Sequence, residues 1–239
     1  MTDRIFGFWT GDNPMNENRQ RGWASFPSTG LAPVLVTPAN LDEWISPGHA
    51  LHPAYPSLST VHRSDYLRAY VMHHHGGGYA DIKPQGGSWL AAVERVERSP
   101  FLWGSGYREV RGGTVWLQNA PIMGRHHVLG LRVPKFVASA ATLTMRAARP
   151  LLIGNCAYFF KPGSPMTRAW LTEVERRLDM MLPALERAPA DNVRARLGDA
   201  SGYPVPWSAI HGDVLQPLAL RFAHRLSRDL PLPSFTDYL

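Results

Sequence analysis

The clearest pattern of hydrophobic and polar positions lies in residues 62–84. Three consecutive glycines, 76–78, follow a helical pattern and predict its end, because glycine adopts backbone angles that other residues adopt only at a cost. Residues 79–82 are too few for another helix and predict a short buried strand, with Asp81 near its end and the breaker Pro84 after it. The helix itself is predicted by a core-facing stripe at i, i+3, i+4 and i+7: Leu67, Tyr70, Val71 and His74.

Similar patterns along the rest of the chain alternate between strand and helix. Apolar runs bounded by turn residues predict strands at 4–9, 33–37, 101–104, 114–117 and 151–160. Helical periodicity predicts helices at 16–25, from Ser88 onward, in the second half of 126–148, at 165–185 and in 207–226, and Asn40 with Glu43 forms a capping-box pattern before a short helix. This alternation predicts one α/β domain over residues 1–239, with an open, mostly parallel sheet flanked by helices.

Two groups of polar residues are predicted to share one edge of this sheet. The turn at residues 9–14 and Asp81 both follow predicted strands, and ligands of open α/β sheets bind at the carboxyl ends of strands. Asp65 and Arg68 lie three residues apart on one helix face, so a carboxylate and a guanidinium stand side by side. We therefore expect all of these residues to line one ligand site. The alternatives are an ordinary surface ion pair for Asp65 and Arg68, and a plain core position for Trp9.

Composition narrows the class of protein without naming a ligand. The chain has 239 residues, of which 44% are hydrophobic and 18% charged, with a formal net charge of +6, as expected of a folded globular protein that favours anionic ligands or surfaces. No basic run with interleaved aromatic residues is present, which argues against nucleic-acid binding. The single Cys156 excludes an internal disulfide and a zinc site built on several cysteines. No transmembrane segment or secretory signal is recognisable, so the expected location is the cytoplasm.

A nucleotide diphosphate sugar suits the residue types at the predicted sheet edge. Trp9 offers a flat partner for the base, and Gly11, Asn13 and Lys83 offer backbone donors or positive charge for the diphosphate. Asp65 with Arg68 provides acceptors and donors at fixed spacing for sugar hydroxyls. The departing diphosphate requires a divalent cation, a lysine or an arginine to stabilise its charge.

The residues Ser64-Asp65-Tyr66-Leu67-Arg68 and Gly76-Gly77-Gly78-Tyr79-Ala80-Asp81 carry a family resemblance. They resemble the sugar-binding region of DXD-type glycosyltransferases with the GT-A fold, in the capsular-polysaccharide and mannosyltransferase-like group (family 32-like). Residues 5–11, which include Thr10 and Gly11, are similar to the first strand of that family. The resemblance implies that Asp65 and Arg68 hold the donor sugar, that Gly77, Gly78 and Tyr79 form the adjoining turn, and that Asp81 faces the metal or sugar.

One departure from the family pattern concerns the second acid of Asp-x-Asp, where this chain has Lys83. A lysine in that position weakens a site for Mn²⁺ or Mg²⁺ that relied on two carboxylates. Two interpretations follow. Lys83 replaces the metal and neutralises the diphosphate, or a metal is held by Asp81 together with a later residue, for which His211 and Asp213 are the candidates. The predicted catalytic residues are accordingly Asp81 and Lys83, with His211 also at the substrate.

The expected function is hexosyl transfer from a nucleotide diphosphate sugar to a glycan or lipid-linked acceptor. Residues 1–84 would form the half that binds the nucleotide sugar, and residues 85–239 the acceptor side and closing helices. No nucleic acid is expected as a partner, and the net charge allows contact with a membrane surface. Two alternatives remain open: a non-catalytic nucleotide-sugar-binding module that has lost metal-dependent activity, and a binder of anionic surfaces driven by charge alone.

Overall fold

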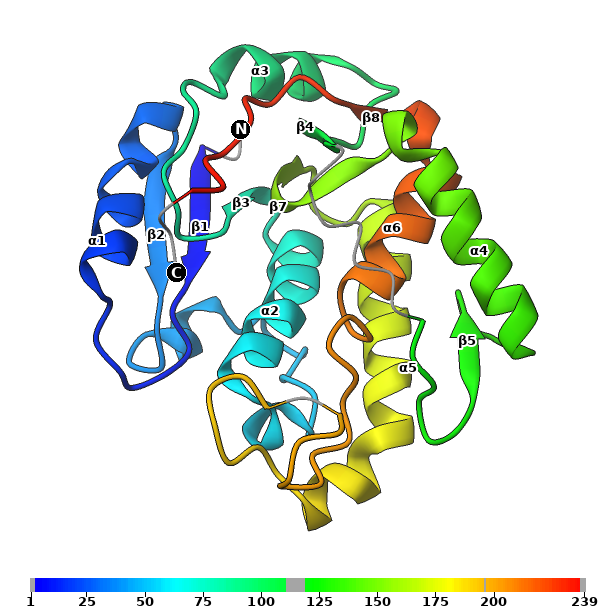
Figure 1. Ribbon diagram of the computed structural model, residues 1–239. Coiled ribbons are helices and arrows are strands. Elements are labelled where there is room, and N and C mark those ends of the chain that lie inside the picture. The colour runs from blue at the N-terminus through cyan, green and yellow to red at the C-terminus, as the bar shows by residue number, and fades with distance from the viewer. Residues whose placement is uncertain (1–2, 111–118, 196, 237–239) are drawn as a thin grey trace.

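The central feature of the computed structural model, which describes residues 3–110, 119–195 and 197–236, is a mixed open β-sheet (Figure 1). Within these residues it has six strands in the order β2-β1-β3-β7-β4-β8. Neighbours pair in parallel except β7, which runs antiparallel to both β3 and β4. The strands are β1 (Arg4–Phe8), β2 (Ala32–Val36), β3 (Gly77–Ala80), β4 (Gly104–Arg108), β7 (Ile153–Phe160) and β8 (Leu226–Ser227). The predicted α/β fold with a mostly parallel open sheet is confirmed.

Helices flank the sheet, and a small hairpin stands apart from it. Several helices begin at a side-chain cap: Asn16, Ser59 and Ser164 each accept a hydrogen bond from a first-turn backbone N–H. The helices are α1 (Glu17–Ala24), α2 (Thr60–His74), α3 (Leu90–Arg98), α4 (Lys135–Ala147), α5 (Pro165–Arg187) and α6 (Gly212–Arg221). The hairpin pairs β5 (His126–Val128) with β6 (Leu131–Val133). No described helix has the length and apolar character that crossing a membrane would require.

Alternating side chains of the strands fill a core on each face of the sheet. On one face Phe6 and Tyr158 pack with α2, α5 and α6, and the α5 stripe predicted from periodicity is fully buried: Trp170, Val174, Leu178 and Met181. On the other face Ile5 and Phe159 pack with Trp89 and the buried side of α3. Most of the site residues described below come from the first face and from the carboxyl edge of the sheet, whereas Trp9 packs against the core of the second face.

Glycines make room for aromatic side chains where β4 pairs with β7. Gly77 and Gly104 both pair with Phe160, and Gly78 pairs with Phe159. A methyl group on Gly104 would lie 2.5 Å from the Phe160 ring. In the same way, the Tyr107 ring of β4 occupies the space where a side chain on Gly154 of β7 would stand. Aromatic rings set against glycines on the paired strand therefore let β4 and β7 pack closely.

Several predicted boundaries differ from the structure. The predicted strand at 101–104 is wrong, because β4 begins at Gly104 and Phe101 is exposed. Asn40 does not cap a helix: its side chain bonds Thr37 N and Leu35 O, and only a 3₁₀ turn (Leu41–Trp44) follows. The C-terminal helical region is shorter than 207–226, since α6 begins at Gly212. The candidate strand at 114–117 lies outside the described residues.

The three glycines at 76–78 serve backbone packing. Gly76 ends α2 with φ +65°, and Gly77 has φ +91° but already belongs to β3. A methyl group on Gly76 would lie 2.6–2.8 Å from Pro162 and from the carbonyl oxygen of Phe160. The chain reverses here so tightly that no side chain fits between the end of α2 and the end of β7.

We predict that Gly76→Ala destabilises the protein more than Gly163→Ala. Both glycines have φ +65°, so both variants carry the left-handed strain of about 1 kcal/mol, but only Gly163 has open space within 4 Å. The contact with backbone atoms brings the expected loss for Gly76→Ala to about 3 kcal/mol. Urea unfolding followed by circular dichroism measures both values, and equal losses would show that the packing at Gly76 is not tight.

Candidate functional site

The carboxyl ends of β1 and β3 meet at one edge of the sheet, as predicted. These strands are adjacent and parallel, with Phe6 beside Tyr79, so the turn after β1 and Asp81 after β3 emerge side by side. Thr10 at the start of the turn donates a hydrogen bond from Oγ1 to the carbonyl oxygen of Thr60, 2.7 Å away. That bond ties the turn to the first residue of α2, the helix that carries Asp65 and Arg68.

The guanidinium of Arg68 forms the centre of the site. Its Nη2 lies 3.2 Å from Asp81 Oδ1, and its Nη1 lies 3.4 Å from Asp65 Oδ1. The same group lies over the Tyr79 ring, 4.7 Å from its centroid, and Nη1 donates to the carbonyl oxygen of Asn155 on β7 at 3.4 Å. Asp65 and Arg68 are therefore not a solvated surface pair: both are nearly buried and belong to a wider charged cluster.

Asp81 is held as a carboxylate by three donors. Tyr79 donates its hydroxyl to Oδ1 at 2.7 Å, and Lys83 Nζ lies 3.3 Å from Oδ2, while Arg68 approaches Oδ1. Burial alone would raise the pKa of Asp81, but the charges of Arg68 and Lys83 and the Tyr79 hydroxyl outweigh it and lower the pKa to about 2. Asp81 is consequently ionised at any physiological pH.

Asp65 and His211 complete the group that we call the Arg68 cluster (Asp65, Arg68, Asp81, Lys83 and His211). Burial raises the pKa of Asp65 to about 6, because Arg68 offsets only part of that cost and the Asp81 charge adds to it. His211 Nδ1 lies 3.3 Å from Arg68 Nη1 and 3.7 Å from Asp65 Oδ1. Burial and the Arg68 charge place the pKa of His211 well below its usual range, so the ring is neutral and can accept a hydrogen bond from Arg68.

Several buried polar atoms around the Arg68 cluster have no hydrogen-bond partner among the described residues. They are Arg68 Nε, Tyr158 Oη, Trp170 Nε1 and Gln216 Oε1. Ring contacts connect them to the cluster, since Tyr158 lies 5.3 Å from Tyr79 and Trp170 lies 6.0 Å from His211. Buried polar atoms are usually paired with protein or water, so this region is suited to a hydroxyl-rich ligand or ordered water.

Sequence reasoning missed Asn155, Tyr158, Trp170 and Gln216. They come from β7, α5 and α6, far along the chain from residues 62–84, and each looked like an ordinary core position. The one local signal was the pair of polar residues in an otherwise apolar strand, Asn155 and Cys156. The Asn155 side chain accepts a hydrogen bond from Gln216 Nε2 at 2.5 Å, which links β7 to α6 beneath Arg68.

Lys83 is covered by the C-terminal segment. Its side chain is almost fully buried, and Nζ lies 4.9 Å from the centroid of the Phe235 ring. Ser234 N donates to the carbonyl oxygen of Pro84 at 2.9 Å, which holds the C-terminal segment beside the residues that follow Lys83. Gly86 also lies so close to this segment that a methyl group would come within 2.3 Å of Leu232 O. In this arrangement Lys83 contacts Asp81 and the protein interior.

The residues predicted to hold a divalent cation do not fit one in this arrangement. Each carboxylate oxygen of Asp81 already faces a cation, and Asp213 Oδ1 accepts a hydrogen bond from Asn119 N at 3.3 Å, within the first turn of α6. Across the described ranges no group of three His, Cys, Asp or Glu side chains is placed to hold a metal ion. Hard cations require several oxygen ligands, and the carboxylates of the Arg68 cluster are already engaged by Arg68 and Lys83.

The predicted turn residues and the predicted glycines of residues 76–78 lie in different parts of the structure. Trp9 is half-buried, and its Nε1 donates to Asn13 O at 2.6 Å, which closes the turn. Gly11 fits closely against Asn13 Oδ1, where a methyl group would come within 2.7 Å. Gly77 and Gly78 lie in the interior of β3, where added methyl groups would meet Arg4 O at 2.9 Å and Trp89 at 3.0 Å. At both glycines, other atoms of the protein already lie against the position that a Cβ would occupy.

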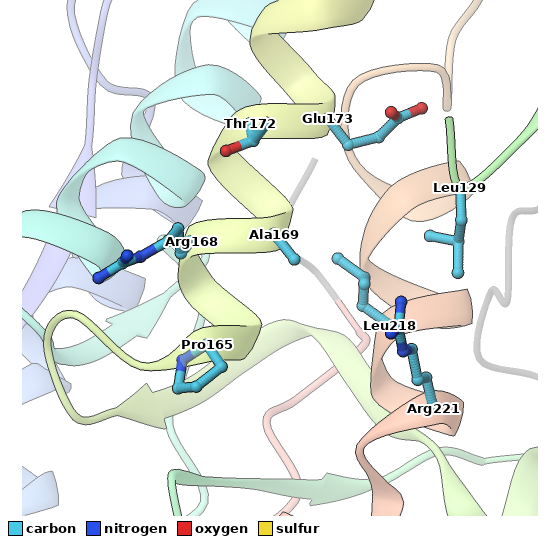
Figure 2. A pocket seen from close by; sticks show the side chains of 8 residues that line it. All are labelled: Leu129, Pro165, Arg168, Ala169, Thr172, Glu173, Leu218 and Arg221. Carbon is cyan, nitrogen blue, oxygen red and sulfur yellow. The ribbon is translucent and has the colours of Figure 1, made fainter. Parts of the chain in front are cut away.

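A separate hollow of about 540 Å³ lies between α5 and α6 (Figure 2). In this view Ala169 of α5 and Leu218 of α6 point toward one another, with Leu129 of the hairpin loop beyond them. The lining residues are Leu129, Pro165, Arg168, Ala169, Thr172, Glu173, Leu218 and Arg221. None belongs to the Arg68 cluster, so this hollow is a different feature from the site at the sheet edge.

Comparison with known proteins adds no family to this picture. A scan against protein-family models gives no match, and a search among curated proteins also gives none. The α/β fold with its mixed open sheet is shown by the structure.

We predict that the effect of Asp65→Asn on stability depends on pH. The folded pKa of about 6 exceeds the ordinary value of 3.8, so the contribution of Asp65 to stability is greatest below pH 4 and falls as pH rises through 6. Asparagine resembles the neutral acid, so the variant should gain roughly 1–3 kcal/mol relative to the original chain between pH 4 and pH 7.

Urea unfolding at several pH values measures this difference. Asp42→Asn, at an exposed carboxylate, is the matched control and should show a difference that stays flat over the same range. A flat profile for Asp65→Asn as well would mean that Asp65 is not desolvated in the folded protein.

Proposed function

We propose that this chain is a glycosyltransferase that transfers a sugar from a nucleotide diphosphate sugar to a glycan or lipid-linked acceptor, in the manner of the GT-A enzymes that its sequence resembles. The observation that carries the proposal is the meeting of the Arg68 cluster with the turn after β1 at the carboxyl ends of two neighbouring strands. Ligands of open α/β sheets bind at such an edge. Capsular or cell-surface polysaccharide synthesis is the process that this activity would serve.

The chemistry of the cluster suits a sugar bound beside a diphosphate. Two carboxylates and a backbone carbonyl hold the Arg68 guanidinium in place before a ligand binds. Little further conformational entropy is therefore lost when the ligand arrives. The unpaired polar atoms of Tyr158, Trp170 and Gln216 offer partners for sugar hydroxyls. Trp9 is half-buried at the end of β1, where one ring face could stack on the base.

The guanidinium of Arg68 could stabilise the departing diphosphate without a metal. Burial lowers the pKa of Arg68, but Tyr79, Asp81 and Asp65 outweigh it and raise that pKa well above the ordinary value, so Arg68 keeps its proton. Fixed positive charge in a site shielded from water stabilises developing negative charge. Lys83 would add a second charge once the C-terminal segment moves away from it.

A specific observation favours the second candidate, a nucleotide-sugar-binding module without catalysis. Both carboxylate oxygens of Asp81 are occupied by cations, and Lys83 is buried beneath Phe235. A carboxylate neutralised in this way would bind a sugar hydroxyl as an acceptor and would not act as a base, because its pKa is about 2. Donor binding without transfer would support this candidate.

We predict that one class of nucleotide diphosphate sugar raises the melting temperature, and that the shift persists in EDTA. A ligand that binds only the folded state stabilises it by about 2.7 kcal/mol at one hundred times its Kd. A panel of UDP- and GDP-sugars, each with EDTA and with manganese, tests this. Transfer or hydrolysis of the active donor then separates the enzyme from the binding module.

In the same assay Asp81→Asn should lower donor turnover by about a hundredfold, because the sugar loses a charged acceptor. Asp229→Asn is the control, since Asp229 also pairs with an arginine, Arg95, but lies away from the cluster. Circular dichroism confirms that both variants fold. Full turnover by Asp81→Asn would remove Asp81 from the site, and no shift with any donor would contradict both candidates.

Lys83→Met and Phe235→Ala should change donor affinity in opposite directions. Loss of the Lys83 charge should weaken binding about tenfold, whereas removal of the ring above it should strengthen binding a few-fold, because less protein has to move. Calorimetric titration with the donor found in the panel measures both constants. Phe101→Ala, at an exposed phenylalanine, is the control for Phe235→Ala. Unchanged affinity in both test variants would show that Lys83 does not contact the diphosphate.

A further inference from the structure

Helix α4 has apolar side chains on two opposite faces. Ala138 and Met145 are buried against the rest of the protein, where α4 packs on α6 and on β5. The opposite face carries an apolar stripe at i, i+4, i+7 and i+11, all of it exposed: Phe136, Ala140, Leu143 and Ala147. Phe136 is 74% exposed and Leu143 64%, and Figure 1 shows α4 at the outside of the molecule. An amphipathic helix that served the core alone would place polar residues on this stripe.

The hairpin next to α4 also carries exposed apolar side chains. Leu131 on β6 is 70% exposed, and it lies four residues before the start of α4. Met123, before β5, and Leu151, after α4, are also at least half exposed. We call Leu131 with the exposed stripe of α4 the α4 face. Single exposed apolar residues are common on proteins, but a row of them along one helix face, with another on the adjoining hairpin, indicates an interaction surface.

The charged side chains that the hairpin and α4 themselves carry are all of one sign. The sequence contains no aspartate or glutamate between Glu109 and Glu173, while Arg125, Arg132, Lys135 and Arg146 are all exposed on the hairpin and α4. Glu173 on α5 is itself nearly buried and bound by Arg176 and Arg177 at 2.7 Å. On α4, Lys135 and Arg146 lie to one side of the stripe, at roughly 80–100° from Phe136 by helical geometry.

We propose that the α4 face docks on an anionic lipid bilayer. Exposed Phe and Leu side chains would enter the boundary between headgroups and acyl chains, while the flanking arginine and lysine residues contact anionic headgroups. A second copy of this chain fits the same face poorly, because a symmetric dimer would bring two cationic surfaces together. Nucleic acid would attract the arginines but would leave Leu131, Phe136 and Leu143 without an apolar partner. The inference rests on this surface alone and holds whatever ligand the Arg68 cluster binds.

Co-sedimentation with vesicles tests the proposal. Vesicles of phosphatidylcholine with 30% phosphatidylglycerol should bind the protein, vesicles of phosphatidylcholine alone should not, and binding should weaken as salt rises. The double variant Phe136→Ser/Leu143→Ser, which leaves the net charge unchanged, should bind at least about tenfold more weakly. Its control is Leu90→Ser/Phe101→Ser, at two residues that are 52% and 68% exposed elsewhere on the surface.

A second pair of variants tests the charges. Arg132→Gln/Arg146→Gln should weaken binding by about 25-fold, since each basic residue near an anionic surface contributes about fivefold. Arg95→Gln/Arg98→Gln removes the same charge from α3 and should change binding less than about threefold. Circular dichroism and melting temperatures confirm that all four variants fold, which is expected of substitutions at exposed positions.

Several results would overturn the proposal. These are absence of binding to anionic vesicles, equal binding to neutral vesicles, or equal loss in the test and control variants. A concentration-dependent dimer that Phe136→Ser/Leu143→Ser abolishes, in protein that does not bind vesicles, would identify a second copy as the occupant. Binding of a mixed-sequence RNA, without vesicle binding, would identify nucleic acid in its place.

Discussion

Arg68 brings a positive charge into the interior of the protein, and a buried charge is costly unless neighbouring groups neutralise it. Two aspartates neutralise this charge, and their own pKa values shift in opposite directions. Asp81 receives donors from Arg68, Lys83 and Tyr79, and its pKa falls to about 2, whereas burial dominates at Asp65 and raises its pKa to about 6. The arrangement of α2 against the end of β3 follows from this requirement, because both carboxylates must reach one guanidinium.

Strand β7 supplies Arg68 with a further partner, a backbone carbonyl oxygen. Because it runs opposite to β3 and β4, its first residues lie at the sheet edge where its neighbours end, and the carbonyl oxygen of Asn155 can therefore accept from Arg68. Farther along the same strand, the Phe160 ring occupies the space beside Gly104 of β4, so β7 also fits closely into the core. The site and the core are thus joined by one strand, so that loosening the packing around β7 would also misplace a partner of Arg68.

The sequence predicted the parts of the molecule that depend on local pattern. The α2 stripe, strands β1 and β2 at one end of the sheet and the Asp65–Arg68 pair follow from periodicities of 3.6 and 2. Periodicity does not say which strands become neighbours, so the insertion of β7 between β3 and β4 was not foreseen, nor were Tyr158 and Gln216 beside Arg68. The cover over Lys83 was equally invisible, because Phe235 lies in a segment with no helical or strand pattern.

The position of β7 also bears on how the chain reaches its fold during synthesis. Strands β1, β2 and β3 can pair once the first 80 residues are made, but β3 then exposes an unpaired edge until residues 153–160 emerge from the ribosome. Closing this half of the sheet requires contacts of long sequence separation, which form slowly. The glycine-rich β3, which has little side-chain bulk to protect its edge, would be the point at which a nascent chain is most open to mispairing or to chaperones.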